Sequence, residues 1–264
     1  SYGFYGLVFV LVFILLIRPL YVILIKQTFN IQTSLDEGSN LRLLKQSARR
    51  ILNYDFVSDE DKSKIKETLH DGKALIPVLS NVYQGPIKKE MAKRMRHHAK
   101  TVMVSTAISQ NGRLDFITIM HVNLRMIKEL VELSGFRPSY QQLAKLSVNV
   151  ITTALVAEGL ENLDISEVLP QSTMNSLSEI PLIKPFISSV TQGISNALLT
   201  LRIGIVTREY LFTTSKELTQ NAIRKTALLE AAALTPQVVA EGLAIFPSKI
   251  FNMFKPKKTK NETA

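Results

Sequence analysis

Helical periodicity between Thr101 and Tyr210 is the feature that most constrains the fold of this chain. In Leu114–Leu133, apolar side chains recur at spacings of three and four residues, which places them on one face of a helix. They are Ile117, Met120, Leu124, Ile127, Leu130 and Val131. Gly135 ends the pattern, and further helices are predicted at roughly Gln141–Leu160 and Pro185–Phe212. Because no alternating strand pattern of useful length occurs, the sequence predicts an all-α fold.

A membrane anchor is predicted at the N-terminal end. Tyr2–Ile17 carries no charge, and Phe4–Ile25 is about as long as a membrane-crossing helix if the Arg18 side chain reaches the headgroups. A cleaved signal peptide is the rival interpretation, but no basic segment precedes the run and no small-residue cleavage site follows it. Since basic residues occur only from Arg18 onward, the positive-inside rule places the body of the protein in the cytoplasm.

The charge and cysteine content narrow the classes of partner and site. The 264 residues carry a net charge of +10, and 46% of them are hydrophobic. Nucleic acid and anionic lipid both suit such a charge, and the membrane segment favours lipid. The lack of cysteine excludes disulfides and thiolate metal sites, and the lack of Trp leaves Tyr and Phe as interfacial aromatic residues.

Four regions are predicted along the chain. Residues 1–29 form the transmembrane anchor, and residues 30–100 form a helical linker region that contains a basic helix. Residues 101–212 form a helical core, and residues 213–264 form an amphipathic C-terminal region with a basic tail. The predicted architecture is an N-terminal transmembrane helix followed by a helical, membrane-associated bundle.

Six cationic residues gather in the helix predicted after Pro86, where Glu90 is the single acid. They are Lys88, Lys89, Lys93, Arg94, Arg96 and Lys100. Against an anionic membrane, each such charge near the surface is worth about 1 kcal/mol. The other interpretation is a helix face that is simply exposed to water, which is what a run of charged residues usually indicates. Nucleic acid is not predicted as a partner, since no aromatic residues are interleaved and no recognition motif is present.

Small residues form a ridge in the helix predicted at Pro185–Phe212. Ser189, Gly193 and Ala197 lie four residues apart, and Gly204 continues the pattern farther along. Such a ridge lets another helix approach closely. The approaching helix belongs either to the same chain or to a second copy, so the ridge predicts intramolecular packing or the seam of a homo-oligomer.

Residues that could carry a reaction are scarce. The chain has no G-x-x-x-x-G-K-[ST] phosphate loop, no G-x-S-x-G and no H-E-x-x-H motif. His97 and His98 are neighbours and point about 100° apart on a helix, which suits a shared metal poorly. His121 is better explained as a core or interface histidine, and Asp115 as a helix cap. We therefore predict no catalytic, cofactor-binding or metal-binding residues, and a protein that is not an enzyme.

Two motifs carry a resemblance to a known family. They are N-L-R-M-I-K-E-L…S-G-F at Asn123–Phe136 and T-Q-G-I-S-N-A-L-L-T-L-R-I-G-I at Thr191–Ile205, with an apolar helix between them. In these the chain resembles the YcjF-like family of bacterial inner-membrane proteins, which carry a domain of unknown function. The resemblance implies an α-helical protein of the inner membrane whose relatives are often encoded beside, or fused to, a P-loop GTPase. That family usually shows two adjacent N-terminal hydrophobic segments, so either another segment precedes Ser1 or the topology differs.

Two functions fit these patterns. The first is an inner-membrane adaptor or scaffold that recruits a protein partner, such as a P-loop GTPase, or builds a homo-oligomer. The alternative is a polytopic transport or pore component in which Leu143–Leu160 and Phe186–Val206 span the bilayer. The charges that distinguish the two are Lys145, Glu158, Arg202 and Arg208. In a span they must pair or line a cavity, whereas in a docked helical domain they face water at the rim.

Overall fold

The computed structural model describes residues 41–109, 112–155, 187–212 and 220–253. Within these ranges the chain is helical and forms no strand, which confirms the all-α prediction for them. The helices are α4 (Leu41–Ile51), α5 (Asp59–Thr68), α6 (Gly72–Val82), the π-helical turn η2 (Tyr83–Ile87), α7 (Lys88–Ile108), α8 (Gly112–Leu133), α9 (Tyr140–Leu155), α12 (Ile187–Phe212) and α13 (Gln220–Met253). The anchor predicted at residues 1–29 lies outside the described residues.

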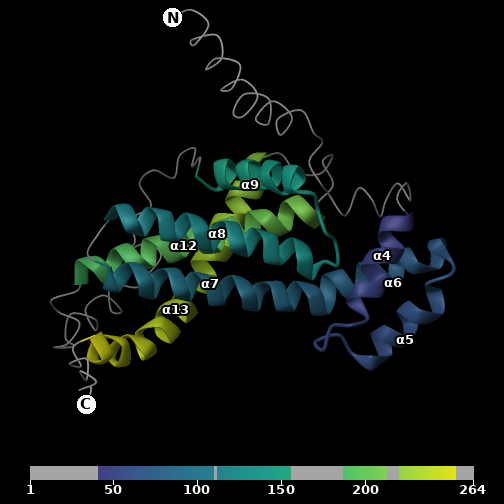
Figure 1. Cartoon of the computed structure of the whole chain (residues 1–264), viewed down its shortest axis with the longest axis horizontal. Coiled ribbons are helices and arrows are strands. Elements are labelled where there is room, and N and C mark those ends of the chain that lie inside the picture. Colours follow the sequence, from purple (N-terminus) through teal and green to yellow (C-terminus); the bar gives the residue numbers. More distant parts are fainter. Residues whose placement is uncertain (1–40, 110–111, 156–186, 213–219, 254–264) are drawn as a thin grey trace, which may run out of the picture.

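Helix α12 forms the centre of the bundle. It packs against α7, α8, α9 and α13, and Figure 1 shows α9 and α7 on different sides of this assembly. Every residue from Ile203 to Arg208 is buried, which requires neighbours all round the helix. Each Leu, Ile or Val buried in this way contributes roughly 1.5–3 kcal/mol relative to exposure, so α12 organises the core.

The chain continues without interruption from α6 through η2 into α7. Pro86 has no N–H to donate, and its ring would clash with the carbonyl oxygen four residues earlier in a regular α-helix. The wider π-helical turn lets the helix pass this proline. The basic helix was expected to start at this proline and to end near Lys100. Both limits are wrong, because the helix continues from α6 through the proline, and α7 ends at Ile108. The regional division predicted after residue 100 falls inside α7.

Helix α4 and the turn that follows it supply hydrogen bonds to the C-terminal end of α8. The last carbonyl groups of a helix have no partner within that helix. Tyr54 Oη donates to the main-chain oxygen of Glu132 at 2.7 Å, and Arg50 Nη1 donates to that of Gly135 at 2.7 Å. Figure 1 shows α4, α5 and α6 grouped near one end of α7. The end of α8 is therefore held by side chains that precede it by about eighty residues.

A buried polar cluster lies beside this cap. Ser47 Oγ lies 2.8 Å from Tyr83 Oη and donates to the main-chain oxygen of Ser134 at 2.8 Å. Burial raises the pKa of the Tyr83 hydroxyl, and the hydrogen bond with Ser47 opposes that rise. Gly135 ends α8 in the left-handed conformation, with φ of 79°, and Ser47 occupies the space where a Cβ would be. The cluster joins α4, η2 and the α8–α9 connection.

Candidate functional site

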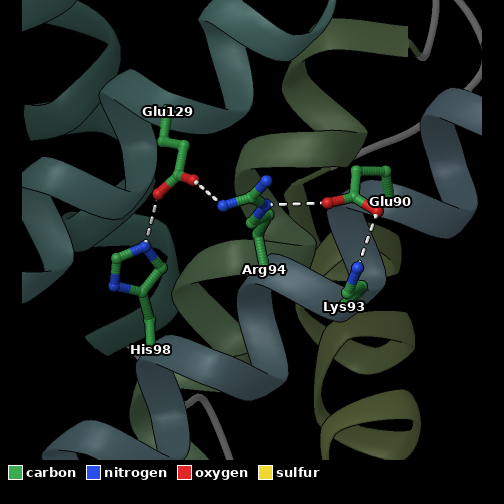
Figure 2. Close-up of polar contacts among 5 residues, drawn as sticks. All are labelled: Glu90, Lys93, Arg94, His98 and Glu129. Carbon is green, nitrogen blue, oxygen red and sulfur yellow. Dashed lines mark hydrogen bonds and ion pairs between the residues drawn. The ribbon is translucent and has the colours of Figure 1, made fainter. Parts of the chain in front are cut away.

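A network of charged side chains links α7 to α8, as Figure 2 shows. Glu129 of α8 bridges two residues of α7: its Oε2 lies 2.7 Å from His98 Nε2, and its Oε1 lies 3.0 Å from Arg94 Nη1. On α7 itself, Glu90 pairs with Arg94 at 2.8 Å and with Lys93 at 3.6 Å. His98 is buried, so its contact with Glu129 replaces water that the ring loses. The network joins two helices and presents no nucleophile.

The described residues offer no evident metal site. Among them, no three His, Asp or Glu side chains gather closely enough to hold a metal ion. The rings of His97 and His98 lie 5.8 Å apart and nearly perpendicular, and His97 is exposed while His98 is buried. His121 is exposed on α8 and is therefore not a core histidine.

The basic helix is partly neutralised by acids from elsewhere in the chain. Arg94 pairs with Glu129 of α8, and Lys100 pairs with Glu241 of α13 at 2.9 Å. Lys88, Lys89 and Lys93 remain exposed, and Arg96 is half-buried. The structure thus places the charges available to an external anion toward the start of α7. The lipid contact predicted for all six cations remains a prediction.

The small-residue ridge of α12 faces α7. A Cβ on Gly193 would lie 2.6 Å from the main-chain oxygen of Met103, and one on Gly204 would lie 2.6 Å from Met95 Sδ. Ala197 is fully buried, whereas Ser189 is half-buried. Gly193 and Gly204 are therefore occupied by contacts within the chain, and the two helices run antiparallel at close range.

A second small-residue stripe, on α13, escaped the sequence analysis. Ala227, Ala231 and Thr235 lie four residues apart and are fully buried. Farther along the helix, a Cβ on Gly242 would lie 2.9 Å from Met103 Sδ. The same spacing that revealed the ridge of α12 could have revealed this stripe. Met103 is enclosed by glycines of α12 and α13.

Arg208 lies in the interior and not at a water-exposed rim, contrary to what the adaptor interpretation expected. Its guanidinium pairs with Glu209 and Glu230, each at 2.7 Å. Burial alone would lower the pKa of this guanidinium, but the hydrogen bonds to the two carboxylates outweigh that effect and raise it. Arg202 is half-buried, and burial lowers the pKa of its guanidinium. Arg202 Nε and Nη2 make no hydrogen bond within the described part of the chain.

An apolar surface is exposed on α8 and α9. Of the large apolar side chains that are exposed in the described residues, most lie on these two helices: Phe116, Ile117, Leu124, Tyr140, Val148 and Leu155. Between the helices runs an open groove of about 560 Å³, whose lining includes Met120, Leu143 and Ile151. The apolar residues predicted on one face of Leu114–Leu133 thus divide between core and surface, since Ile127 and Leu130 are buried but Ile117 and Leu124 are exposed.

Helix α13 also has membrane-like composition. Within the described residues, Gln220–Ile245 is the one helical stretch long and apolar enough to cross a bilayer. A third of its most apolar window is buried inside the protein, and the core helix of a soluble protein can pass the same test. Length and composition alone therefore do not assign it to lipid.

The chain is similar to several bacterial proteins named UPF0283 membrane protein. The protein of Rhizobium meliloti (strain 1021) is 27% identical over 149 residues, which cover 54% of this chain and 39% of the relative. That of Agrobacterium fabrum is 24% identical over 178 residues, which cover 65% of this chain and 47% of the relative. The chain thus spans less than half the length of these relatives, whose names state no activity. No solved structure matches the chain.

A family model covers most of the helical bundle. It describes a domain of unknown function, DUF697, and matches residues 70–243, from the start of α6 into the second half of α13. Because this match extends over more than half of the chain, the protein belongs to the DUF697 family.

Proposed function

We propose that this protein is a bacterial inner-membrane adaptor or scaffold whose helical body lies in the cytoplasm. The observation that carries the proposal is the exposed apolar surface of α8 and α9. Monomeric soluble proteins rarely expose large contiguous apolar patches, and those that do usually use them to meet another molecule. That surface suits a body held against the membrane, and the protein acts from there by binding a protein partner or further copies of itself through its other surfaces.

The polar clusters support this proposal because each serves to hold helices together. Glu129 joins α8 to α7, Arg208 joins α12 to α13 through Glu230, and Ser47 joins α4 to the end of α8. Buried polar groups that are engaged in this way stabilise one arrangement of helices. The result is a rigid platform that presents its outer surfaces to partners.

The comparisons support the membrane location and leave the partner open. The relatives carry the name membrane protein, and the two motifs of the YcjF-like resemblance lie within the matched residues 70–243. We infer that the chain is a YcjF-like protein. By that resemblance, a P-loop GTPase is the first partner to test, and a homo-oligomer is the second.

Site-specific crosslinking in native membranes tests the proposal. Since the chain has no cysteine, a single introduced cysteine carries a photoreactive label at one known place. Lys89→Cys on α7 and Glu67→Cys on α5 both replace exposed residues. We expect the adaptor to form a crosslink to a second protein or to another copy from at least one position. Unlabelled samples given the same illumination are the control. If labels across α5, α7 and α8 yield no protein adduct in native membranes, the adaptor proposal fails.

The alternative function, a transport or pore component, placed its spans at Leu143–Leu160 and Phe186–Val206, but in the described part of the chain Gln220–Ile245 passes the test for a span and neither α9 nor α12 does. The alternative is therefore favoured by the length and apolar character of α13, and by the pairing of buried Arg208 with two carboxylates. In that case the middle of Gln220–Ile245 would lie in the bilayer. Ala233→Cys replaces an exposed residue near this midpoint. In opened cells, a membrane-impermeant maleimide should label this cysteine if the protein is a scaffold. Protection comparable to that of a cysteine in the bilayer would favour the pore component.

A further inference from the structure

The α8–α9 surface is unusual because α8 is apolar on two sides. Met126, Ile127 and Leu130 face the core and are fully buried. Toward the start of the same helix, Phe116 and Ile117 are about two-thirds exposed. A helix at the surface of a soluble protein normally presents one apolar stripe to the core and a polar face to water. The core therefore explains only one of the two apolar sides of α8.

Cations outnumber acids around this surface, and the acids Asp115 and Glu132 lie at its two ends on α8. No acid occurs in α8 from Phe116 to Lys128 or anywhere in α9. The same segments contain Arg125, Lys128 and Lys145; Arg125 and Lys128 are exposed, and Lys128 pairs with Glu132, one turn on, at 3.8 Å. An apolar surface with a cationic border is complementary to a layer that is apolar inside and anionic at its edge.

The groove offers few groups that would recognise a protein. Besides apolar side chains, its lining includes only hydroxyl groups, those of Tyr140, Ser147 and Thr152, and no charged group. Specific protein interfaces typically form about one hydrogen bond per 100–200 Å², whereas acyl chains require none. Tyr140, which is 90% exposed, and Phe116 can occupy the headgroup level in a chain without Trp. These features favour lipid over a second protein as the occupant.

We propose that the α8–α9 surface lies against an anionic phospholipid bilayer, with its apolar side chains in the outer acyl region and Arg125 and Lys128 among the headgroups. This inference rests on the proposed membrane location and adds the face by which the body meets the membrane. It also moves the lipid contact from the basic helix α7, which exposes no large apolar side chain, to α8 and α9. Such a contact typically buries an apolar face about 5–10 Å deep.

Fluorescence of single tryptophans tests the contact, because the chain has none of its own. The full chain is reconstituted into vesicles of neutral phosphatidylcholine or of phosphatidylcholine with anionic phosphatidylglycerol, each with and without brominated acyl chains. Tyr140→Trp and Val148→Trp report on the α8–α9 surface. His97→Trp reports on the exposed side of α7, and Glu67→Trp reports on α5.

We expect brominated lipid to quench and blue-shift the emission of Tyr140→Trp and Val148→Trp, more strongly in anionic vesicles. His97→Trp and Glu67→Trp should keep an emission typical of water. Adding Arg125→Gln to Val148→Trp should lower the ratio of docked to undocked protein about fivefold, because each cation near an anionic surface is worth about 1 kcal/mol. Lys128→Gln should lower it less, because Glu132 already neutralises part of that charge. High salt should act in the same direction.

Three results would overturn the proposal in distinguishable ways. A chain that stays apart from the vesicles defeats the membrane location together with the docking face. A chain that enters the vesicles without quenching at Tyr140→Trp or Val148→Trp defeats the docking face alone, and protection of those positions from aqueous iodide would assign the surface to protein. Equal quenching at all four positions would mean that the whole body is embedded, as the pore alternative requires.

Discussion

Replacing Gly193 by alanine is the sharpest test of how α12 packs against α7. The new Cβ would lie 2.6 Å from the main-chain oxygen of Met103 and 3.4 Å from the Cβ of Ala107. A main-chain oxygen cannot rotate away, so the two helices must separate locally. Overpacking of this kind costs typically about 1–3 kcal/mol. Alanine is also a better helix former than glycine by about 1 kcal/mol, which offsets part of that cost.

The matched control is Gly85→Ala, where a Cβ would meet no atom within 4 Å. Both substitutions gain the intrinsic preference of alanine, but residue 85 directly precedes Pro86, whose ring disfavours a Cβ in the helical conformation, so the difference between the two variants is a lower bound on the packing term. We expect Gly193→Ala to unfold more easily than Gly85→Ala by about 1–3 kcal/mol, with roughly 2–4 °C of melting temperature per kcal/mol for a chain of this size. Circular dichroism during thermal and denaturant unfolding in mild detergent measures both quantities.

The reasoning would be refuted if the two variants unfolded at the same temperature and denaturant concentration. It would also be refuted if Gly193→Ala were as stable as the unchanged protein while its oligomeric state changed. In that case the ridge would contact a second copy, and its proximity to Met103 would not limit the size of residue 193.

Three further predictions concern single side chains and the topology. Burial raises the pKa of Tyr83 in the folded protein, so as the pH rises past about 10, the usual pKa of tyrosine, the unfolded chain ionises this residue first and the free energy of unfolding falls. Tyr83→Phe should lower the free energy of unfolding by about 1 kcal/mol at neutral pH and should lessen its fall at alkaline pH, as measured by urea unfolding from pH 7 to 11. Arg208→Met should destabilise the protein by up to about 3 kcal/mol in the same assay. This is the low end of the range for broken buried ion pairs, because the Glu230 side chain is one-third exposed and regains water; an unchanged urea midpoint of unfolding would contradict the prediction. A reporter fused after Lys260 should be active in the cytoplasm, and periplasmic activity would overturn the orientation and favour a membrane-crossing α13.

Much of the helical architecture was accessible from the sequence because helix signals are local. The periodicity of Leu114–Leu133 predicted α8 closely, and Ser58 caps α5 as its sequence context indicates. The continuation of the helix past Pro86 was not accessible. A proline after a glycine normally ends a helix. Here the helix continues through a π-helical turn that contains Tyr83, and Tyr83 contacts Ser47 and Phe212. Those contacts form only after distant segments meet.

The candidate surfaces were less predictable for a related reason. Spacing showed which residues of α12 are small but not which helix fills the gap beside them. Two cations of the basic helix, Arg94 and Lys100, are neutralised by Glu129 and Glu241, which lie far along the chain. Helical spacing predicts only pairs three or four residues apart, so it could not predict these ion pairs. Periodicity also cannot separate a core face from an outer one when a helix is apolar on both sides, so it placed exposed Leu124 and buried Ile127 on the same face.

The unbroken run from α6 through η2 to α7 has a mechanical consequence. From Gly72 to Ile108 it forms one rod roughly 55 Å long, at 1.5 Å per residue. A helix of this length transmits movement, because a displacement of α5 and α6 is carried along its hydrogen-bonded turns to the far end. This helix bends most easily at the wider turn Tyr83–Ile87, and the hydrogen bond between Ser47 and Tyr83 stabilises it at that point. Force on the α4–α6 end is thereby transmitted to the row of contacts where Met103 meets Gly193 and Gly242.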